Sequence, residues 1–214
     1  HSFITLLSDE AMAEARAAAM EQCEAGGQVF VHPYHDERVI AGQGTVGLEL
    51  LNDVPDLDVL VVPVGGGGLL AGMAVAAKAL KPDSEIIGVE AALYPSMSQA
   101  LGKVDVPPAP DTPATPGSGA GGHTIAEGIA VKVPGELTRP VIAELVSDLV
   151  LVDEKSLEMA VQTYLEAQRI LTEGAGAASL AAVMDNRERF KGRKIGLVVS
   201  GGNMDSRLLS SILM

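Results

Sequence analysis

Four consecutive glycines form the most distinctive local pattern in this sequence. They follow an apolar, strand-like run at residues 57–64 and precede a helix-like run at residues 69–78. Glycine loses more backbone entropy on folding than any other residue, so packing alone does not favour such a repeat. Without Cβ atoms, however, successive N–H groups can face one point, where the positive end of the following helix dipole also lies. The pattern predicts a phosphate-binding turn made by Gly65, Gly66, Gly67 and Gly68.

A second strand-like run, residues 195–199, ends in a similar turn, Ser-Gly-Gly-Asn, which begins at Ser200. The Ser200 hydroxyl could bond a polar ligand atom such as a ring nitrogen, or it could cap a helix starting near Asp205; the sequence does not separate these roles. Glu127 and Glu173 each lie beside glycines. They are candidate acid/base or substrate-orienting carboxylates, with a helix-terminal or solvated carboxylate as the alternative.

The glycine turn alone does not identify its ligand. Residues 66–71 fit the G-x-G-x-x-A pattern, and Glu90 ends the next strand-like run, where a dinucleotide fold places its ribose-binding acid. A nicotinamide or flavin dinucleotide is therefore one alternative, and a tight turn without a ligand is another. Leu69 and Leu70 replace the Lys and Ser/Thr of a Walker-type loop, which excludes that type of nucleotide site.

Strand-like and helix-like runs alternate along the chain, which predicts a doubly wound α/β domain with a parallel sheet. Ligands of such sheets bind at the carboxyl ends of the strands. A segment rich in Pro, Gly, Ala and Ser at about residues 103–122 is predicted to be a flexible loop. The predicted strands are residues 28–31, 57–64, 85–90, 149–152 and 195–199, and the predicted helices are residues 9–24 with Ser8 as cap, 38–51, 69–78, 139–146, 154–170, a small-residue helix after Gly176 and one near Asp205.

Composition limits the classes of partner. The chain has 214 residues, 47% of them hydrophobic, which is ordinary for one globular domain or slightly more. Its formal net charge of −13 argues against extended contact with nucleic acid or an anionic membrane. Pro63 and the glycines interrupt the uncharged run at residues 59–77, which excludes a membrane span there. One cysteine, Cys23, fits a reducing cytoplasm. Five Lys and Arg residues within 187–194 are interpreted as a solvated turn.

Taken together, these segments resemble the fold-type II pyridoxal-phosphate enzymes, in particular the threonine dehydratase and serine racemase family. The matching segments occur in family order at residues 39–45, 63–69, 124–132, 134–138, 173–177 and 200–203 with Asp205. The resemblance implies that pyridoxal 5′-phosphate is the cofactor, that the amides of Gly65 to Leu69 hold its phosphate, and that Ser200 faces its ring nitrogen. It also implies a remnant of a small domain at residues 1–32 and a cofactor-binding large domain at residues 33–214.

The implied reaction is β-elimination of the hydroxyl group from threonine or serine, which gives a 2-oxo acid and ammonia. A neutral hydroxyl such as Ser200 does not keep the ring nitrogen protonated, so the ring is a weaker electron sink and suits elimination. The partner that the resemblance implies is a small amino-acid substrate. Because the absence of the family's other domain should expose apolar surface, we also expect a homo-oligomer, most simply a dimer. Neither nucleic acid nor a membrane is expected as a partner.

The sequence also departs from the family pattern. The family's Schiff-base lysine lies in a Ser-x-Lys-x-Arg context that is absent here, and Lys132 is the lysine nearest to pocket-forming segments. We therefore expect a truncated chain that is inactive alone, with a non-catalytic phosphate-binding or assembly module as the alternative. Glu90 matches the glutamate of the family's cation site, but Ser96 stands where serine racemases carry an aspartate. A bound mono- or divalent cation is left open.

Overall fold

The structure of this chain, a computed structural model, describes residues 12–104 and 121–214. The predicted cap Ser8 and most of the predicted loop at 103–122 lie outside the described residues. The chain divides into two compact units, His1–Pro33 and Tyr34–Met214. The interpretation of these units as parts of a small and a large domain stays a prediction.

The first unit contains one described helix, α1 (Met12–Gly26). It confirms the helix predicted there and ends two residues later than expected. Residues 28–31 were predicted to form a strand, and this prediction is wrong. Val29 and Val31 are 75% and 53% exposed. No strand of the described residues pairs with them, so the backbone has no ladder to join.

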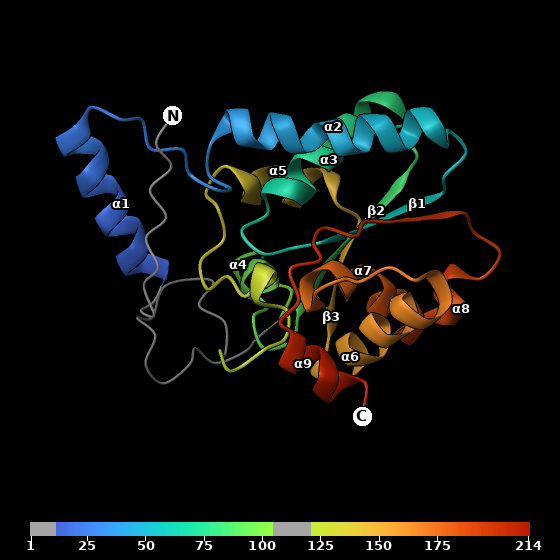
Figure 1. The fold of residues 1–214 in the computed structure, drawn as a ribbon. Helices are drawn as coiled ribbons and strands as arrows, with labels where there is room; N and C mark the ends of the chain where they lie inside the picture. The colour runs from blue at the N-terminus through green and yellow to red at the C-terminus, as the bar shows by residue number, and fades with distance from the viewer. Residues whose placement is uncertain (1–11, 105–120) are drawn as a thin grey trace. The chain divides into compact units, whose positions relative to one another are not determined.

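The second unit contains a four-stranded parallel sheet, which confirms the predicted doubly wound α/β fold (Figure 1). Its strands lie in the order β3-β2-β1-β4. They are β1 (Val59–Pro63), β2 (Glu85–Ala91), β3 (Asp148–Val152) and β4 (Ile195–Leu197). The chain builds β2 and β3 on one side of β1 and then returns to add β4 on the other side. The strand order therefore reverses between β1 and β4, where open α/β sheets bind ligands at the carboxyl ends.

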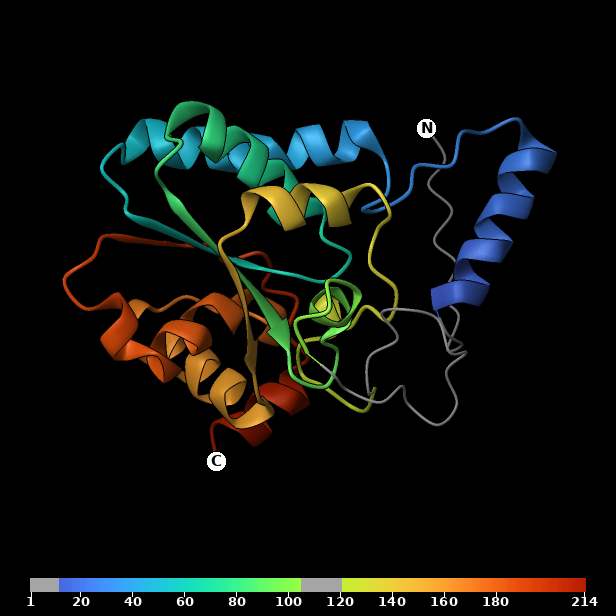
Figure 2. The same ribbon diagram turned by 180° about the vertical axis from the view of Figure 1, so that it is seen from behind.

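Helices cover both faces of the sheet (Figures 1 and 2). One layer contains α2 (Glu37–Asp53), α3 (Gly68–Leu80) and α5 (Thr138–Leu145). The other layer contains α6 (Glu154–Thr163) with a π-helical continuation (Tyr164–Gln168), α7 (Gly174–Asp185), α8 (Arg187–Phe190) and α9 (Ser206–Ile212). Two short elements, α4 (Ser96–Ala100) and a 3₁₀ helix (Glu127–Ile129), were not predicted.

The sheet is buried on both faces because successive strand residues alternate between the two helical layers. Leu60 and Val62 of β1 belong to the hydrophobic cluster that includes α3 residues, whereas Val59 and Val61 belong to the cluster that includes α7 residues. All four are fully buried. This two-sided burial explains why the strand reads as a continuous apolar run. Among the described residues, no helix combines the length and apolar character that crossing a membrane requires.

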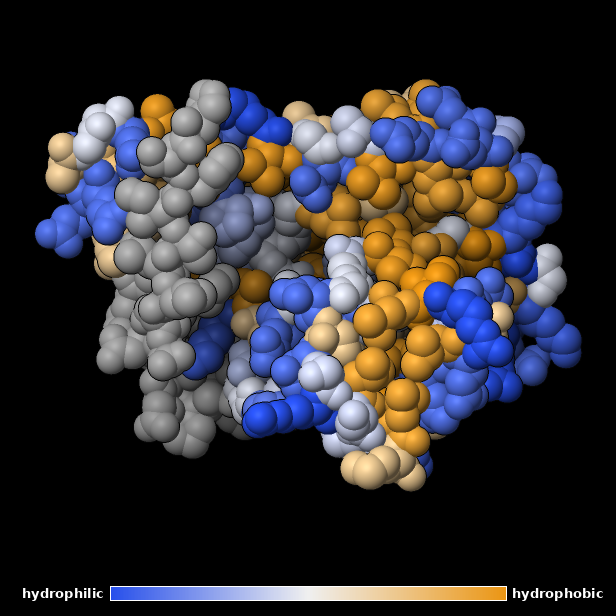
Figure 3. Space-filling view, viewed as in Figure 1, coloured by the Kyte–Doolittle hydropathy of each residue, from blue (hydrophilic) through white to orange (hydrophobic). Residues whose placement is uncertain are grey.

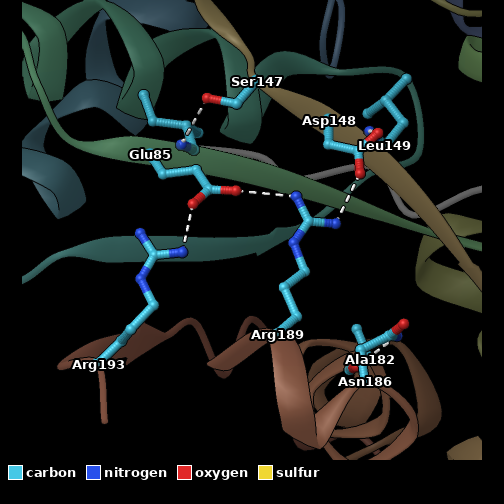
Figure 4. A network of polar contacts seen from close by, with 9 residues as sticks. Glu85, Ser147, Asp148, Leu149, Ala182, Asn186, Arg189 and Arg193 are labelled. Atoms are coloured by element: carbon cyan, nitrogen blue, oxygen red, sulfur yellow. Dashed lines mark hydrogen bonds and ion pairs between the residues drawn. The ribbon is translucent and has the colours of Figure 1, made fainter. Parts of the chain in front are cut away.

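The amino ends of the strands carry a network of ion pairs (Figure 4). Arg189 lies between the carboxylates of Glu85 and Asp148, at 2.8 and 2.6 Å, and Arg193 contacts Glu85 at 2.5 Å. The side chains of Arg189 and Arg193 are only 32% and 31% exposed. The interpretation of this basic cluster as a solvated turn is therefore wrong for these two residues. Glu85 and Asp148 are the first residues of β2 and β3. The ion pairs therefore join α8 and the segment before β4 to the amino ends of these two strands.

Arg189→Met is expected to lower the free energy of unfolding by about 1–2 kcal/mol at pH 7, because it leaves two partly buried carboxylates without their shared cation. Arg187→Met is the control, since within residues 12–104 and 121–214 the Arg187 side chain bonds only the Met184 carbonyl of the neighbouring turn. Urea unfolding of both variants at low and high salt measures the difference. Equal stability of the two variants would contradict the prediction.

The stability loss in Arg189→Met has an expected pH dependence. Partial burial raises the pKa of the Glu85 carboxyl, but hydrogen bonds from Arg189 and Arg193 outweigh that effect and hold its pKa below the ordinary value. A carboxyl with a lowered folded-state pKa stabilises the protein above its unfolded-state pKa. The stability difference between wild type and Arg189→Met should therefore be full above about pH 4.5 and shrink as the pH falls through the lower folded-state pKa.

Candidate functional site

Both predicted glycine turns lie at the point where the strand order reverses. The first leaves β1 and leads into α3, whose N-cap is Gly67 with φ +92°. The second leaves β4, in which Leu197 is level with Val61 of β1. Ser200 follows Leu197 by three residues and Val64 follows Val61 by three, so both turns reach the same end of the sheet. The topology thus brings together segments that are more than a hundred residues apart.

The amides of the first turn have no acceptor in the described part of the chain. Gly66, Gly67 and Gly68 are buried and Leu69 is half-buried. None of their N–H groups donates a hydrogen bond within residues 12–104 and 121–214. Buried N–H groups without an acceptor are rare in folded proteins. These donors, at the amino end of a 13-residue helix, suit an anionic ligand.

Gly66 and Gly67 are also required by close packing, a reason for glycine that was not predicted from the sequence. A Cβ atom on Gly66 would lie 2.2 Å from Cγ of Tyr34, whose ring covers the turn. A Cβ atom on Gly67 would lie 2.7 Å from both Met97 Cε and Thr138 Oγ1. Close packing fixes the position of the turn from one side, while its amides find no acceptor in the part of the chain that the structure describes.

The carbonyl of Gly66 is held by two donors from the segment that precedes and begins α5. Gly135 N donates to it at 3.0 Å, and Thr138 Oγ1 donates to it at 2.7 Å. Thr138 is fully buried. Residues 134–138 matched the family pattern in the sequence, but no feature of the sequence alone gave Thr138 a function.

Ser200 is exposed, and the structure rules out its alternative role as a helix cap. Asp205 caps α9 instead, because its carboxylate accepts hydrogen bonds from Arg207 N at 2.9 Å and Leu208 N at 3.0 Å. The Ser200 hydroxyl therefore takes no part in starting α9. It lies in the second glycine turn, beside the first.

Glu173 joins three segments near the second glycine turn. Its carboxylate accepts a hydrogen bond from Asn203 N at 3.1 Å. A Cβ atom on Gly201 or Gly128 would lie 2.6 or 2.9 Å from Glu173 Oε1, so the carboxylate fits between these two glycines. Glu127, beside Gly128, is exposed on the 3₁₀ helix. The two candidate carboxylates therefore differ, since Glu173 is tied to the backbone and Glu127 faces solvent.

Glu90 is fully buried, and its carboxylate is hydrogen-bonded to residues of α4. Its carboxylate accepts hydrogen bonds from Met97 N at 2.7 Å, Ser98 N at 2.9 Å and Ser98 Oγ at 2.5 Å. Burial raises the pKa of Glu90, and these hydrogen bonds act in the opposite direction. With no exposed surface, Glu90 is not available to a ribose, which removes the acid that the dinucleotide alternative needs.

The candidate cation site gains no support. Ser96 Oγ, near Glu90 in the sequence, is buried and has no hydrogen-bond partner among the residues that the structure describes. Within the described ranges, no group of three or more His, Cys, Asp and Glu side chains has the arrangement that could hold a metal ion.

None of the seven lysines, all in described ranges, is buried at the first glycine turn. Lys78 donates to the carbonyls of Pro82 and Ser84, and Lys81 donates to that of Leu57. The remaining five are exposed: Lys103, Lys132, Lys155, Lys191 and Lys194. Val131, next to Lys132 in the chain, contacts the turn near Gly65.

Comparison with known proteins decides the family. The sequence profile of the pyridoxal-phosphate dependent enzymes matches residues 4–201. This chain belongs to that family. It is 42% identical over 200 residues to an L-threonine ammonia-lyase of Thermotoga maritima and 44% identical over 200 residues to one of Geobacter sulfurreducens. Each match covers 94% of this chain and 47% of the relative, so the chain spans about half the length of these curated relatives.

Solved structures of other family members have the same fold. Maize serine racemase matches with a TM-score of 0.80 and 33% identity, covering 96% of this chain and 62% of that one. The processed form of threonine deaminase isoform 2 from Solanum lycopersicum matches with a TM-score of 0.85 and 31% identity, covering 97% and 55%. The resemblance read from the sequence motifs is thereby confirmed.

Proposed function

We propose that this chain forms the phosphate-binding, large-domain portion of a pyridoxal-phosphate dependent threonine/serine ammonia-lyase. The proposed reaction is β-elimination of a hydroxy amino acid to a 2-oxo acid and ammonia. The observation that carries the proposal is the row of buried amides that have no acceptor within the described residues, at the place where the strand order of the sheet reverses. The similarity to L-threonine ammonia-lyases supports the substrate class.

In this proposal each part of the site has a separate task. The amides of Gly65 to Leu69 bind the cofactor phosphate, and the dipole of α3 favours its negative charge. When bound, pyridoxal phosphate supplies the ring that withdraws electrons from the substrate. Ser200 hydrogen-bonds the ring nitrogen as a neutral group. Glu173 positions the second glycine turn through Asn203 N, and Glu127 is the candidate that faces the substrate.

We expect this polypeptide alone to bind the cofactor phosphate. We expect no turnover, because none of its lysines is buried at the first glycine turn. Pyridoxine 5′-phosphate is the suitable probe, since it lacks the aldehyde that reacts with exposed lysines. Calorimetric titration should detect binding of this ester, much weaker binding of pyridoxine, and no binding of NAD. Threonine with added pyridoxal phosphate should give no 2-oxobutyrate. Failure to bind the ester would overturn the proposal, and NAD binding would restore the dinucleotide alternative.

We further propose that copies of the chain associate, most simply as a dimer. Among the strands of the described residues, β4 lies at the edge of the sheet and pairs only with β1, and open strand edges favour pairing. Val46 and Leu48 of α2 and Val199 after β4 are exposed apolar residues, and Leu50 of α2 packs near Gly196 of β4. Figure 3 shows hydrophobic residues gathered on the face viewed there, between the layer that contains α2 and the layer that contains α7.

Sedimentation velocity over a range of concentrations tests the association, and a monomer throughout would contradict it. Association without ester binding would instead favour the non-catalytic assembly module.

The single cysteine, Cys23, is compatible with a cytoplasmic location, which we propose as well.

A further inference from the structure

Thr138 is a fully buried polar residue at the first position of α5. Its hydroxyl carries one proton and lies 2.7 Å from the carbonyl oxygen of Gly66 and 3.0 Å from that of Gly135. The shorter distance favours donation to Gly66. Gly135 N donates to the same Gly66 oxygen at 3.0 Å. One carbonyl of the glycine turn is therefore held by two donors from outside the turn.

Holding this carbonyl also fixes the direction of the next amide. The peptide unit between Gly66 and Gly67 is planar and trans, so its C=O and N–H groups point in opposite directions. With the carbonyl directed toward Gly135 and Thr138, the Gly67 N–H must face the other side of the turn. That N–H has no acceptor among the described residues.

Glycine makes this restraint necessary. A Gly-Gly peptide has more accessible conformations than any other and could rotate to satisfy its own buried N–H group. Rotation by half a turn would exchange the carbonyl and the amide, and it would place an oxygen where an anion binds. The two external donors oppose that rotation because it would leave the buried Gly135 N–H without its acceptor and the Thr138 hydroxyl with only its longer contact to the Gly135 carbonyl.

We infer that Thr138 is a positioning residue that holds the Gly66–Gly67 peptide in the anion-binding orientation. The inference rests on the proposed function, since the anion is the phosphate ester of the cofactor. Thr138 does not contact the ligand in this account. It acts through the Gly66 carbonyl.

The test compares Thr138→Val, which keeps the shape but removes the hydroxyl, with Thr138→Ser, which keeps the hydroxyl but removes the methyl group. For each protein, the affinity for pyridoxine 5′-phosphate is measured against that for pyridoxine, so that the ratio isolates the phosphate contribution. Thr138→Val should lower this ratio by about tenfold or more, and Thr138→Ser should stay within about twofold of wild type. A residue that only supports α5 would change both affinities together and leave the ratio unchanged.

Each outcome separates the inference from the proposed function. If wild type does not bind the ester, the proposed function fails and the inference fails with it. If wild type binds and Thr138→Val keeps the same ratio, only the inference fails. If valine prevents folding, Thr138→Ala is measured in its place with the same expected loss. In the ¹⁵N–¹H spectrum, the Gly67 amide of wild type and Thr138→Ser should shift when the ester is added, and an unmoved resonance would overturn the inference.

Discussion

Gly67→Ala is expected to weaken binding of pyridoxine 5′-phosphate by about tenfold or more. Gly67 has φ +92°, a conformation that costs an alanine about 1–2 kcal/mol. The new Cβ atom would also lie 2.7 Å from Thr138 Oγ1 and 2.9 Å from Ile142 Cδ1. The clash displaces the Thr138 hydroxyl from the Gly66 carbonyl, and the strain at positive φ is relieved only by a change in the backbone of the turn. Both changes disturb the amides at the amino end of α3. Calorimetric titration of the variant measures the loss.

Gly192→Ala is the matched control for that variant. Gly192 also has a positive φ, +75°, but a Cβ atom there would meet no atom of the described residues within 4 Å. It lies in the turn before β4, at the opposite end of the strand from Ser200. The control should lose stability through backbone strain and keep its affinity for the ester. If Gly67→Ala bound the ester as tightly as the control does, the glycine turn would not be the phosphate site.

Gly72→Ala is expected to lower the free energy of unfolding by about 3 kcal/mol or more, the upper range for overpacking a tight contact. Gly72 lies where α3 crosses α2. A Cβ atom there would lie 2.1 Å from the carbonyl oxygen of Ile40 and 2.7 Å from the amide of Gly44. Both are backbone atoms that no rotamer change can move, so the helices must separate. Urea unfolding followed by circular dichroism measures the effect.

Gly42→Ala should have the opposite sign in the same assay. Gly42 lies within α2 and is exposed. No atom of the part of the chain that the structure describes lies within 4 Å of the added Cβ position, apart from the helix's own neighbouring backbone. Alanine there should raise the free energy of unfolding by about 0.5–1 kcal/mol, since it removes backbone freedom from the unfolded chain. A loss of less than about 1 kcal/mol in Gly72→Ala would contradict the close helix crossing.

Local patterns were sufficient to predict the elements that carry the site. The apolar run, the glycines and the alanine-rich segment after them fix β1, the turn and α3 within a few residues, because each depends on neighbouring residues. Asp205, predicted to lie near a helix start, caps α9 through its own carboxylate. The motif order was enough to identify the family.

Features that depend on distant contacts could not be predicted in this way. Residues 28–31 have strand-like composition but no partner strand in the described part of the chain. Glu90 looked available to a ligand because its burial depends on α4, which the sequence did not reveal. Arg189 looked solvated because its partners Glu85 and Asp148 begin strands far away in the sequence. Thr138 was overlooked because its hydrogen bond to Gly66 joins residues 72 positions apart.

The position of β4 beside β1 has a consequence for local opening of the sheet. The two glycine turns are more than a hundred residues apart in the sequence, and they reach the same end of the sheet only when β4 pairs with β1. Detachment of this strand would leave the first turn in place but would carry Ser200 away from it. A ligand held by both turns would therefore oppose opening of the sheet at β4.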